Sequence, residues 1–138
     1  MDTTDSDLVR LAAAALNPQQ LGDGNWAADV GAAVEAANGT VFTGASVGGY
    51  LSVCAEQSAI TQMMSKTGPV VRRVVALWRD PVDGTLNVLP PCGRCREFLR
   101  VVSQQNLEAV VILGPGTRRT LGNMLPFHGW HAEPILGA

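Results

Sequence analysis

The residues of this sequence best suited to chemistry are three cysteines and one glutamate. Cys92 and Cys95 lie three residues apart in "PPCGRC", and the third cysteine, Cys54, stands two residues before Glu56. Three thiolates are soft ligands that suit Zn²⁺, and a zinc site with three protein ligands keeps its fourth position for water, as catalytic zinc sites do. The chain has no fourth cysteine. We therefore predict a catalytic zinc site with these three cysteines as its ligands.

Glu56 is predicted to carry protons at this site. It follows Cys54 by two residues, so it lies in the same first helical turn, close enough to hydrogen-bond a water on the metal but poorly placed to replace that water. The catalytic role therefore falls to Glu56.

Two other kinds of site could also use these cysteines. A Cys-x-x-Cys pair in a reducing compartment can be a redox centre or simply two buried thiols. A structural zinc site could be closed by a histidine, His128 or His131, because Cys₃His is a common arrangement. In that second case Glu56 would have no role.

The predicted ligands must be positioned by two helices. Apolar residues recur at helical spacing over residues 53–64, and a second helix is predicted over residues 92–102, directly behind the two prolines. Cys54 and Cys92 thus stand near two helix N-termini, where the helix dipole favours a thiolate. Two such helix ends can converge on one cation.

The remaining elements indicate a mixed α/β fold. Periodicity and turn signals predict, in addition, a helix over residues 6–16, a strand-turn-strand unit around Asn38-Gly39, strands over 70–78 and 109–113, and a short helix within 120–125, after which the chain reads as irregular. The order α-β-β-α-β-α-β suggests a mixed sheet with helices on both sides.

Length and composition limit the possible partners. A chain of 138 residues is expected to form one domain, 1–138, and it contains no apolar run of the ~20 residues that a membrane helix needs. Its net charge is −2 and its ten basic residues are scattered, so neither nucleic acid nor a membrane is an expected partner. The acidic opening "MDTTDSD" is unlike a secretory signal, which favours a cytoplasmic protein.

At the predicted zinc ligands the sequence resembles the cytidine deaminase superfamily. "CAE" at 54–56 and "PCGRC" at 91–95 match its metal signature, while "VGAAVEAANG" at 30–39 and "LGNMLPF" at 121–127 resemble its first hairpin and its closing region. The short, three-cysteine branch, which contains cytidine deaminases and blasticidin-S deaminase, is the most similar. The resemblance implies an α/β/α sandwich with a mixed five-stranded sheet and one Zn²⁺. It also implies a homotetramer in which one subunit completes a neighbour's site.

The same resemblance implies how a substrate is bound and converted. In the established scheme for zinc deaminases, zinc activates a water and a glutamate, here Glu56, transfers the protons. The backbone of Ala55 and of Pro91 would recognise the amine that leaves. The implied positions around the rest of the substrate are Ala28, Ser46, Phe127 and Trp130.

The sequence departs from the family pattern at three places. "GASVGGYLSVCAE" is shorter than the family's stretch and lacks the Asn and Glu that hold ribose hydroxyls in nucleoside deaminases. Gln57 stands where the family usually has an arginine that offsets the charge of the thiolates, a role that Arg94 or Arg96 could take over. The family's aromatic residue beside the base is matched by Ala28, which leaves Trp26, Tyr50, Phe127 or Trp130 as replacements.

These observations predict a zinc-dependent hydrolytic deaminase of a cytosine-like aminopyrimidine base or nucleoside. The alternatives are a deaminase of another amino-heterocycle, such as a blasticidin-S-like antibiotic, and a catalytically silent zinc-bearing interaction domain. Because the ribose-binding groups are missing, cytidine is not expected to be the best substrate.

Overall fold

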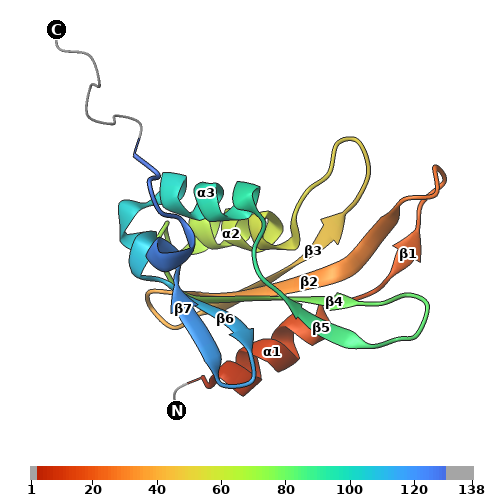
Figure 1. Cartoon of the computed structure of the whole chain (residues 1–138), viewed down its shortest axis with the longest axis horizontal. Coiled ribbons are helices and arrows are strands. Elements are labelled where there is room, and N and C mark those ends of the chain that lie inside the picture. The colour runs from red at the N-terminus through yellow and green to blue at the C-terminus, as the bar shows by residue number, and fades with distance from the viewer. Residues whose placement is uncertain (1–2, 130–138) are drawn as a thin grey trace, which may run out of the picture.

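The computed structural model describes residues 3–129, and the elements run in the order helix, three strands, helix, two strands, helix and two strands (Figure 1). The α-helices are α1 (Asp5–Ala14), α2 (Ala55–Lys66) and α3 (Gly93–Val102), and two short 3₁₀ helices, η1 (Gln104–Glu108) and η2 (Leu121–Met124), follow. The strands are β1 (Gln19–Gln20), β2 (Trp26–Ala36), β3 (Val41–Val47), β4 (Val71–Arg79), β5 (Leu86–Leu89), β6 (Val110–Gly114) and β7 (Thr117–Thr120).

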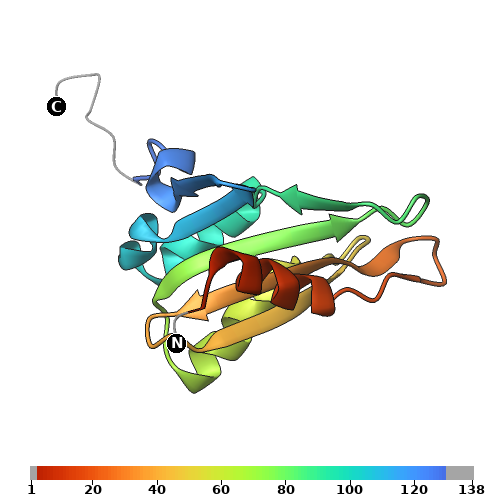
Figure 2. The same cartoon turned by 90° about the horizontal axis from the view of Figure 1, so that it is seen from below.

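These elements form the expected three layers. Helices α2 and α3 lie side by side on one face of the sheet, and α1 crosses the other face (Figures 1 and 2). Each helical layer seals its own core: Ile60, Met63 and Leu99 pack against the sheet beneath α2 and α3, and Leu8 packs with Leu77 beneath α1. The predicted α/β/α sandwich is therefore confirmed.

Within residues 3–129 the sheet has seven strands, so the expected number of five is wrong. It is nevertheless five positions wide. β3 pairs with one edge of β2, while β1 and β4 share its other edge; β5 and β6 likewise share the far edge of β4, and β7 closes the sheet beside β6. Among the described strands only the β4–β6 pair is parallel, which makes the sheet mixed. The two additional strands arise because long β2 and β4 each extend beyond one neighbour and pair with a second, short one.

The first helix is anchored at its N-terminus by a capping box. The Thr4 side chain accepts a hydrogen bond from the Asp7 backbone N–H, and the Asp7 carboxylate accepts one from the Thr4 N–H. Reciprocal caps of this kind satisfy backbone donors that the first helical turn leaves unpaired. Within residues 3–129 no helix is long and apolar enough to cross a membrane.

Candidate active site

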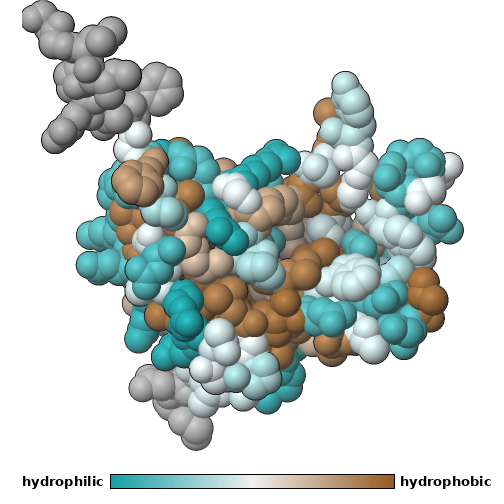
Figure 3. Space-filling model, in the orientation of Figure 1, coloured by the Kyte–Doolittle hydropathy of each residue, from teal (hydrophilic) through white to brown (hydrophobic). Residues whose placement is uncertain are grey.

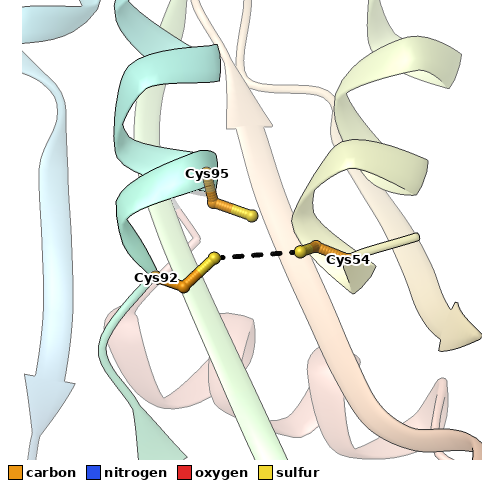
Figure 4. Close-up of side chains that lie close together, drawn as sticks. All are labelled: Cys54, Cys92 and Cys95. Carbon is orange, nitrogen blue, oxygen red and sulfur yellow. Dashed lines mark hydrogen bonds between the residues drawn. The ribbon is translucent and has the colours of Figure 1, made fainter. Parts of the chain in front are cut away.

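The three cysteines meet between the N-termini of α2 and α3 (Figure 4). Their Sγ atoms all lie within 4.8 Å of one another, and the Sγ atoms of Cys54 and Cys92 are 3.9 Å apart. Cys95 is buried, Cys54 is half-buried and Cys92 is exposed, so the cluster opens to solvent on one side. Among the described residues, neither Glu56 nor His128 belongs to this group of potential metal ligands.

The spacing of the thiols fits zinc. Zinc–sulfur bonds of about 2.3 Å in tetrahedral geometry place neighbouring sulfurs about 3.8 Å apart. The Cys54–Cys92 separation agrees with that value, and the third sulfur needs only a small side-chain adjustment to reach the same metal. The three cysteines are thus positioned to bind one Zn²⁺.

Local sequence places each cysteine at a helix cap. Cys54 and Cys92 are the N-cap residues of α2 and α3, both with extended backbone, and Cys95 follows in the first turn of α3. The Gln57 side chain accepts a hydrogen bond from the Cys54 N–H at 3.3 Å. The residue in the position of the usual arginine therefore fixes the α2 cap, on which one ligand depends.

The position of α2 depends on a close approach to the sheet at Gly44 in β3. A Cβ atom at this position would lie 2.6 Å from both the Ala55 carbonyl oxygen and the Ala59 nitrogen, which are backbone atoms of α2. A similar approach occurs on the opposite face, where a Cβ at Gly31 would lie 2.4 Å from the Ala12 carbonyl oxygen of α1. Both helices therefore rest on glycines, but of these two only α2 has a cysteine of the thiol cluster at its N-terminus.

We expect Gly44→Ala and Gly31→Ala to separate stability from metal binding. Each substitution forces a helix away from the sheet and should lower the free energy of unfolding by about 1–3 kcal/mol, measured in urea. Only Gly44→Ala should also weaken zinc binding in a chelator competition, because the displaced helix positions Cys54. Equal loss of zinc affinity in the two variants would show that α2 does not position the metal ligand in this way.

The thiols are unequal in acidity. Burial raises the pKa of Cys95, and the nearby Glu56 carboxylate adds to that rise. Burial also raises the pKa of Cys54. For Cys92 burial acts in the same direction, but hydrogen bonds from the Cys95 backbone N–H and from Cys54 outweigh it and lower the pKa. A helix N-terminus alone therefore does not make all three thiolates favourable, whereas a bound cation would stabilise them.

Glu56 lies in the first turn of α2 with only 5% of its surface exposed. Burial raises the pKa of its carboxyl group, while hydrogen bonds from its own backbone N–H and from Cys95 act in the opposite direction. A buried carboxyl group with a raised pKa is suited to accept and return a proton near neutral pH.

A pocket of about 280 Å³ opens beside Glu56 and two of the cysteines. Its wall is formed by residues of β2, β3, the segment between β3 and α2, the first turn of α2, the end of β5 and the segment that follows β5: Asp29, Val30, Ser46, Gly48, Ser52, Val53, Cys54, Ala55, Glu56, Leu89, Pro90 and Cys92. Of the expected substrate contacts, Ala55 and Ser46 are in this wall. The volume is close to the lower end of small-molecule sites.

The other expected substrate contacts are placed differently. Phe127 and Tyr50, two of the suggested replacements for the aromatic residue that Ala28 matches, both have fully exposed side chains. Ala28 is buried next to the wall residue Asp29. Trp130 and His131 lie outside the described residues.

Two arginines hold the segments that carry the ligands. Arg94 donates a hydrogen bond to the Ser52 carbonyl oxygen at 3.1 Å, and Arg96 donates to the Pro91 carbonyl oxygen at 2.7 Å and to the Met124 carbonyl oxygen at 3.0 Å. Pro91 is therefore already engaged, although a carbonyl oxygen has a second lone pair for a substrate amine. Within residues 3–129 the guanidinium groups of both arginines donate to backbone carbonyls and not to a thiol, whereas the backbone N–H of Arg94 donates to Cys92.

Asp29 and Trp78 were not predicted from the sequence as residues of the site. The Asp29 carboxylate, in the pocket wall, accepts hydrogen bonds from the Ser46 hydroxyl and from the Trp78 indole N–H, both at 3.3 Å. A signal was present, because Asp29 is an isolated charge inside the small apolar run "WAADVGAAV".

A larger polar hollow of about 700 Å³ lies elsewhere, around Glu35, Arg72, Arg73 and Arg118. Arg73 bridges the carboxylates of Glu35 at 2.7 Å and Asp5 at 2.8 Å, so its charge is largely satisfied by these partners. These contacts hold the start of α1 to the sheet. No described residue that lines this hollow also lines the pocket beside Glu56, and none of them is a cysteine. The residues suited to catalysis therefore lie at the smaller pocket.

Comparisons with known proteins agree with this site. Residues 2–113 match the family model of the cytidine and deoxycytidylate deaminase zinc-binding region. The chain is 37% identical over 100 residues to a cytidine deaminase from Mycobacterium tuberculosis, covering 70% of this chain and 69% of that protein. It is 27% identical over 103 residues to a blasticidin-S deaminase from Bacillus cereus, covering 70% and 74%. A solved structure of a mutant M. tuberculosis cytidine deaminase superposes with a TM-score of 0.72 at 29% identity, covering 91% of this chain and 98% of that one.

Proposed function

This chain belongs to the cytidine and deoxycytidylate deaminase family and is a zinc-dependent hydrolase of the C–N bond in a cytosine-like base or nucleoside, and we propose that Glu56 is its proton carrier. Cys54, Cys92 and Cys95 would hold the zinc, which when bound supplies Lewis-acid activation of water. The observation that carries the proposal is a cluster of three thiols beside a pocket whose wall contains two of them and one buried carboxyl group.

In the proposed reaction each proton is handled by Glu56. Its carboxylate accepts a proton from the attacking water and passes it to the ring nitrogen next to the carbon that is attacked. It then transfers the second water proton to the departing amine, so that the amine and water are exchanged for a carbonyl group and ammonia. Backbone groups of Ala55 and Pro91 would orient that amine, and the apolar Val30 and Leu89 in the wall suit the face of a planar ring.

The direct test is ammonia release from a panel of aminopyrimidine bases, nucleosides and nucleoside antibiotics. We expect at least one aminopyrimidine to release ammonia, chelation to abolish release, and added zinc to restore it. A protein with one zinc per chain that deaminates no member of the panel would instead support a silent zinc-bearing domain.

We also propose that cytidine is a poor substrate relative to the best member of that panel. The segment between β3 and α2 contributes Gly48, Ser52 and Val53 to the pocket, and none of these carries the amide or carboxylate that the family uses for ribose. In this proposal the kcat/KM for cytidine falls below the ~10⁴–10⁸ M⁻¹s⁻¹ range of enzymes on their own substrates. The likeness to a blasticidin-S deaminase favours a nucleoside antibiotic as the second candidate substrate.

The remaining proposals concern assembly and environment. We infer a single-domain protein that works in the cytoplasm on a small molecule, without nucleic acid or membrane as a partner; its three free thiols and net charge of −2 support this. We infer a homotetramer, which is supported by exposed apolar side chains at Leu51, Val82 and Val101. Apolar surface is also visible in Figure 3 over the middle of the molecule, where β5 lies in Figure 1.

A further inference from the structure

Asp29 is a carboxylate in the pocket wall with much of its hydrogen-bonding capacity unused. A carboxylate offers about four acceptor positions. Asp29 uses two of them, for the Ser46 hydroxyl and the Trp78 indole N–H, and both contacts are long at 3.3 Å. Among the ion pairs formed by residues 3–129, none includes Asp29.

The pocket around Asp29 is anionic. The described wall contains two carboxylates, Asp29 and Glu56, and two thiols, and it contains no lysine, arginine or histidine. One zinc ion with three thiolates has a net charge of −1, so bound metal does not reverse the sign. A carboxylate in a partly buried site is stabilised by a cation or by strong donors.

The backbone beside Asp29 is held in an unusual conformation that sets the direction of its side chain. Ala28 has a φ of 56°, a left-handed conformation that a residue with a Cβ seldom adopts, and the β2–β3 register shifts between Ala27 and Gly31. Such bulges redirect a side chain and are common next to active sites. Strained backbone of this kind persists where the surrounding structure enforces it, and it is concentrated at functional sites.

Resting on the proposed deaminase function, we propose that Asp29 selects the substrate by charge. It binds a positively charged substituent, an amine or a guanidinium, carried by the amino-heterocycle, and the anionic pocket rejects a phosphate at the same position. The Ser46 hydroxyl and the Trp78 N–H hold the carboxylate in place for this contact. The substrate class is therefore a cationic derivative of the base, and a nucleotide is excluded.

Three ligands that differ in their 5′ group, and through it in charge, test this proposal: 5′-amino-5′-deoxycytidine, cytidine and cytidine 5′-monophosphate. Their dissociation constants are measured by calorimetry in the zinc-loaded Glu56→Gln protein, which should bind without turnover, and their kcat/KM values in the unmodified protein. We expect the amine to bind about tenfold or more tightly than cytidine, as for a charge-assisted hydrogen bond, and the monophosphate to bind more weakly than cytidine.

The residue is tested by Asp29→Asn, which keeps the shape of the side chain and one acceptor for Ser46 or Trp78. The preference for the amine over the monophosphate should fall by about tenfold or more. Glu108→Gln removes the same charge from an exposed residue outside the pocket and should leave the order of the three affinities unchanged.

The results distinguish this proposal from the deaminase function. If the amine binds most tightly and the monophosphate least tightly but no ligand is deaminated, charge selection stands and the deaminase activity is contradicted. If cytidine is deaminated but all three ligands bind with equal affinity, the deaminase activity stands and charge selection is contradicted. If the same order of affinities persists in Asp29→Asn, Asp29 is not the selecting residue. The order is first measured in proteins with Asp29 intact, so the proposal remains testable even if Asp29→Asn folds poorly.

Discussion

Glu56→Gln is expected to lose about 10²–10⁴-fold in kcat while keeping its zinc and its fold. The amide has nearly the shape of the carboxyl group, so the almost fully buried site should accommodate it. It cannot take a proton from water and return it to the ring nitrogen, and for that reason the chemical step should fail. Steady-state kinetics, metal analysis and urea unfolding on the same preparation measure the three properties separately.

The control for this variant is again Glu108→Gln, because Glu108 is exposed on η1. It should retain full turnover. If Glu56→Gln retained turnover as well, Glu56 would have no part in proton transfer, and the acid-base group would have to be another residue of the pocket wall.

Cys92→Ala is expected to lower the zinc content from one ion per chain to well below one and to reduce turnover to background. The side chain of Cys92 is exposed, so its removal should leave no cavity in the core. Its sulfur lies 3.9 Å from that of Cys54, and among the described residues no other side chain joins this cluster to replace it. Elemental analysis after dialysis measures the occupancy.

The unmodified protein supplies the comparison for this variant. After chelation and re-addition of zinc it should regain its metal and its turnover, whereas Cys92→Ala should regain neither. One tightly held zinc ion in Cys92→Ala would show that Cys92 is not a ligand.

Local sequence signals were sufficient to predict the helices and the metal cluster. The helices that carry Cys54 and Cys92 were predicted within about two residues of their observed bounds, because each has apolar periodicity and a clear stop or start signal. Two of the cysteines stand at helix starts, and the third lies in the first turn of the second helix. This spacing leaves few ways to arrange the three thiols. The predicted cluster of all three is what the structure shows.

Features that depend on pairing between distant segments were missed. β7, "TRRT", is exposed throughout and has no apolar alternation, so only its pairing with β6 makes it a strand. β1 and β5 are short strands that likewise form only by pairing, each along a free edge of a longer strand. Asp29 reaches the pocket through a bulge and two side-chain contacts from β3 and β4, which no local pattern predicts.

The separation of the two capping cysteines along the chain affects how the protein acquires its metal. Cys54 and Cys92 are 38 residues apart, with β4 and β5 between them, so their sulfurs meet only after both helices have docked on the sheet. Contacts between distant segments form slowly and late in folding. Zinc should therefore bind after the helices have docked and stabilise the folded chain, rather than nucleate folding. Because it would bind the folded chain selectively, each tenfold rise in free zinc above its dissociation constant adds about 1.4 kcal/mol to the stability of the docked state.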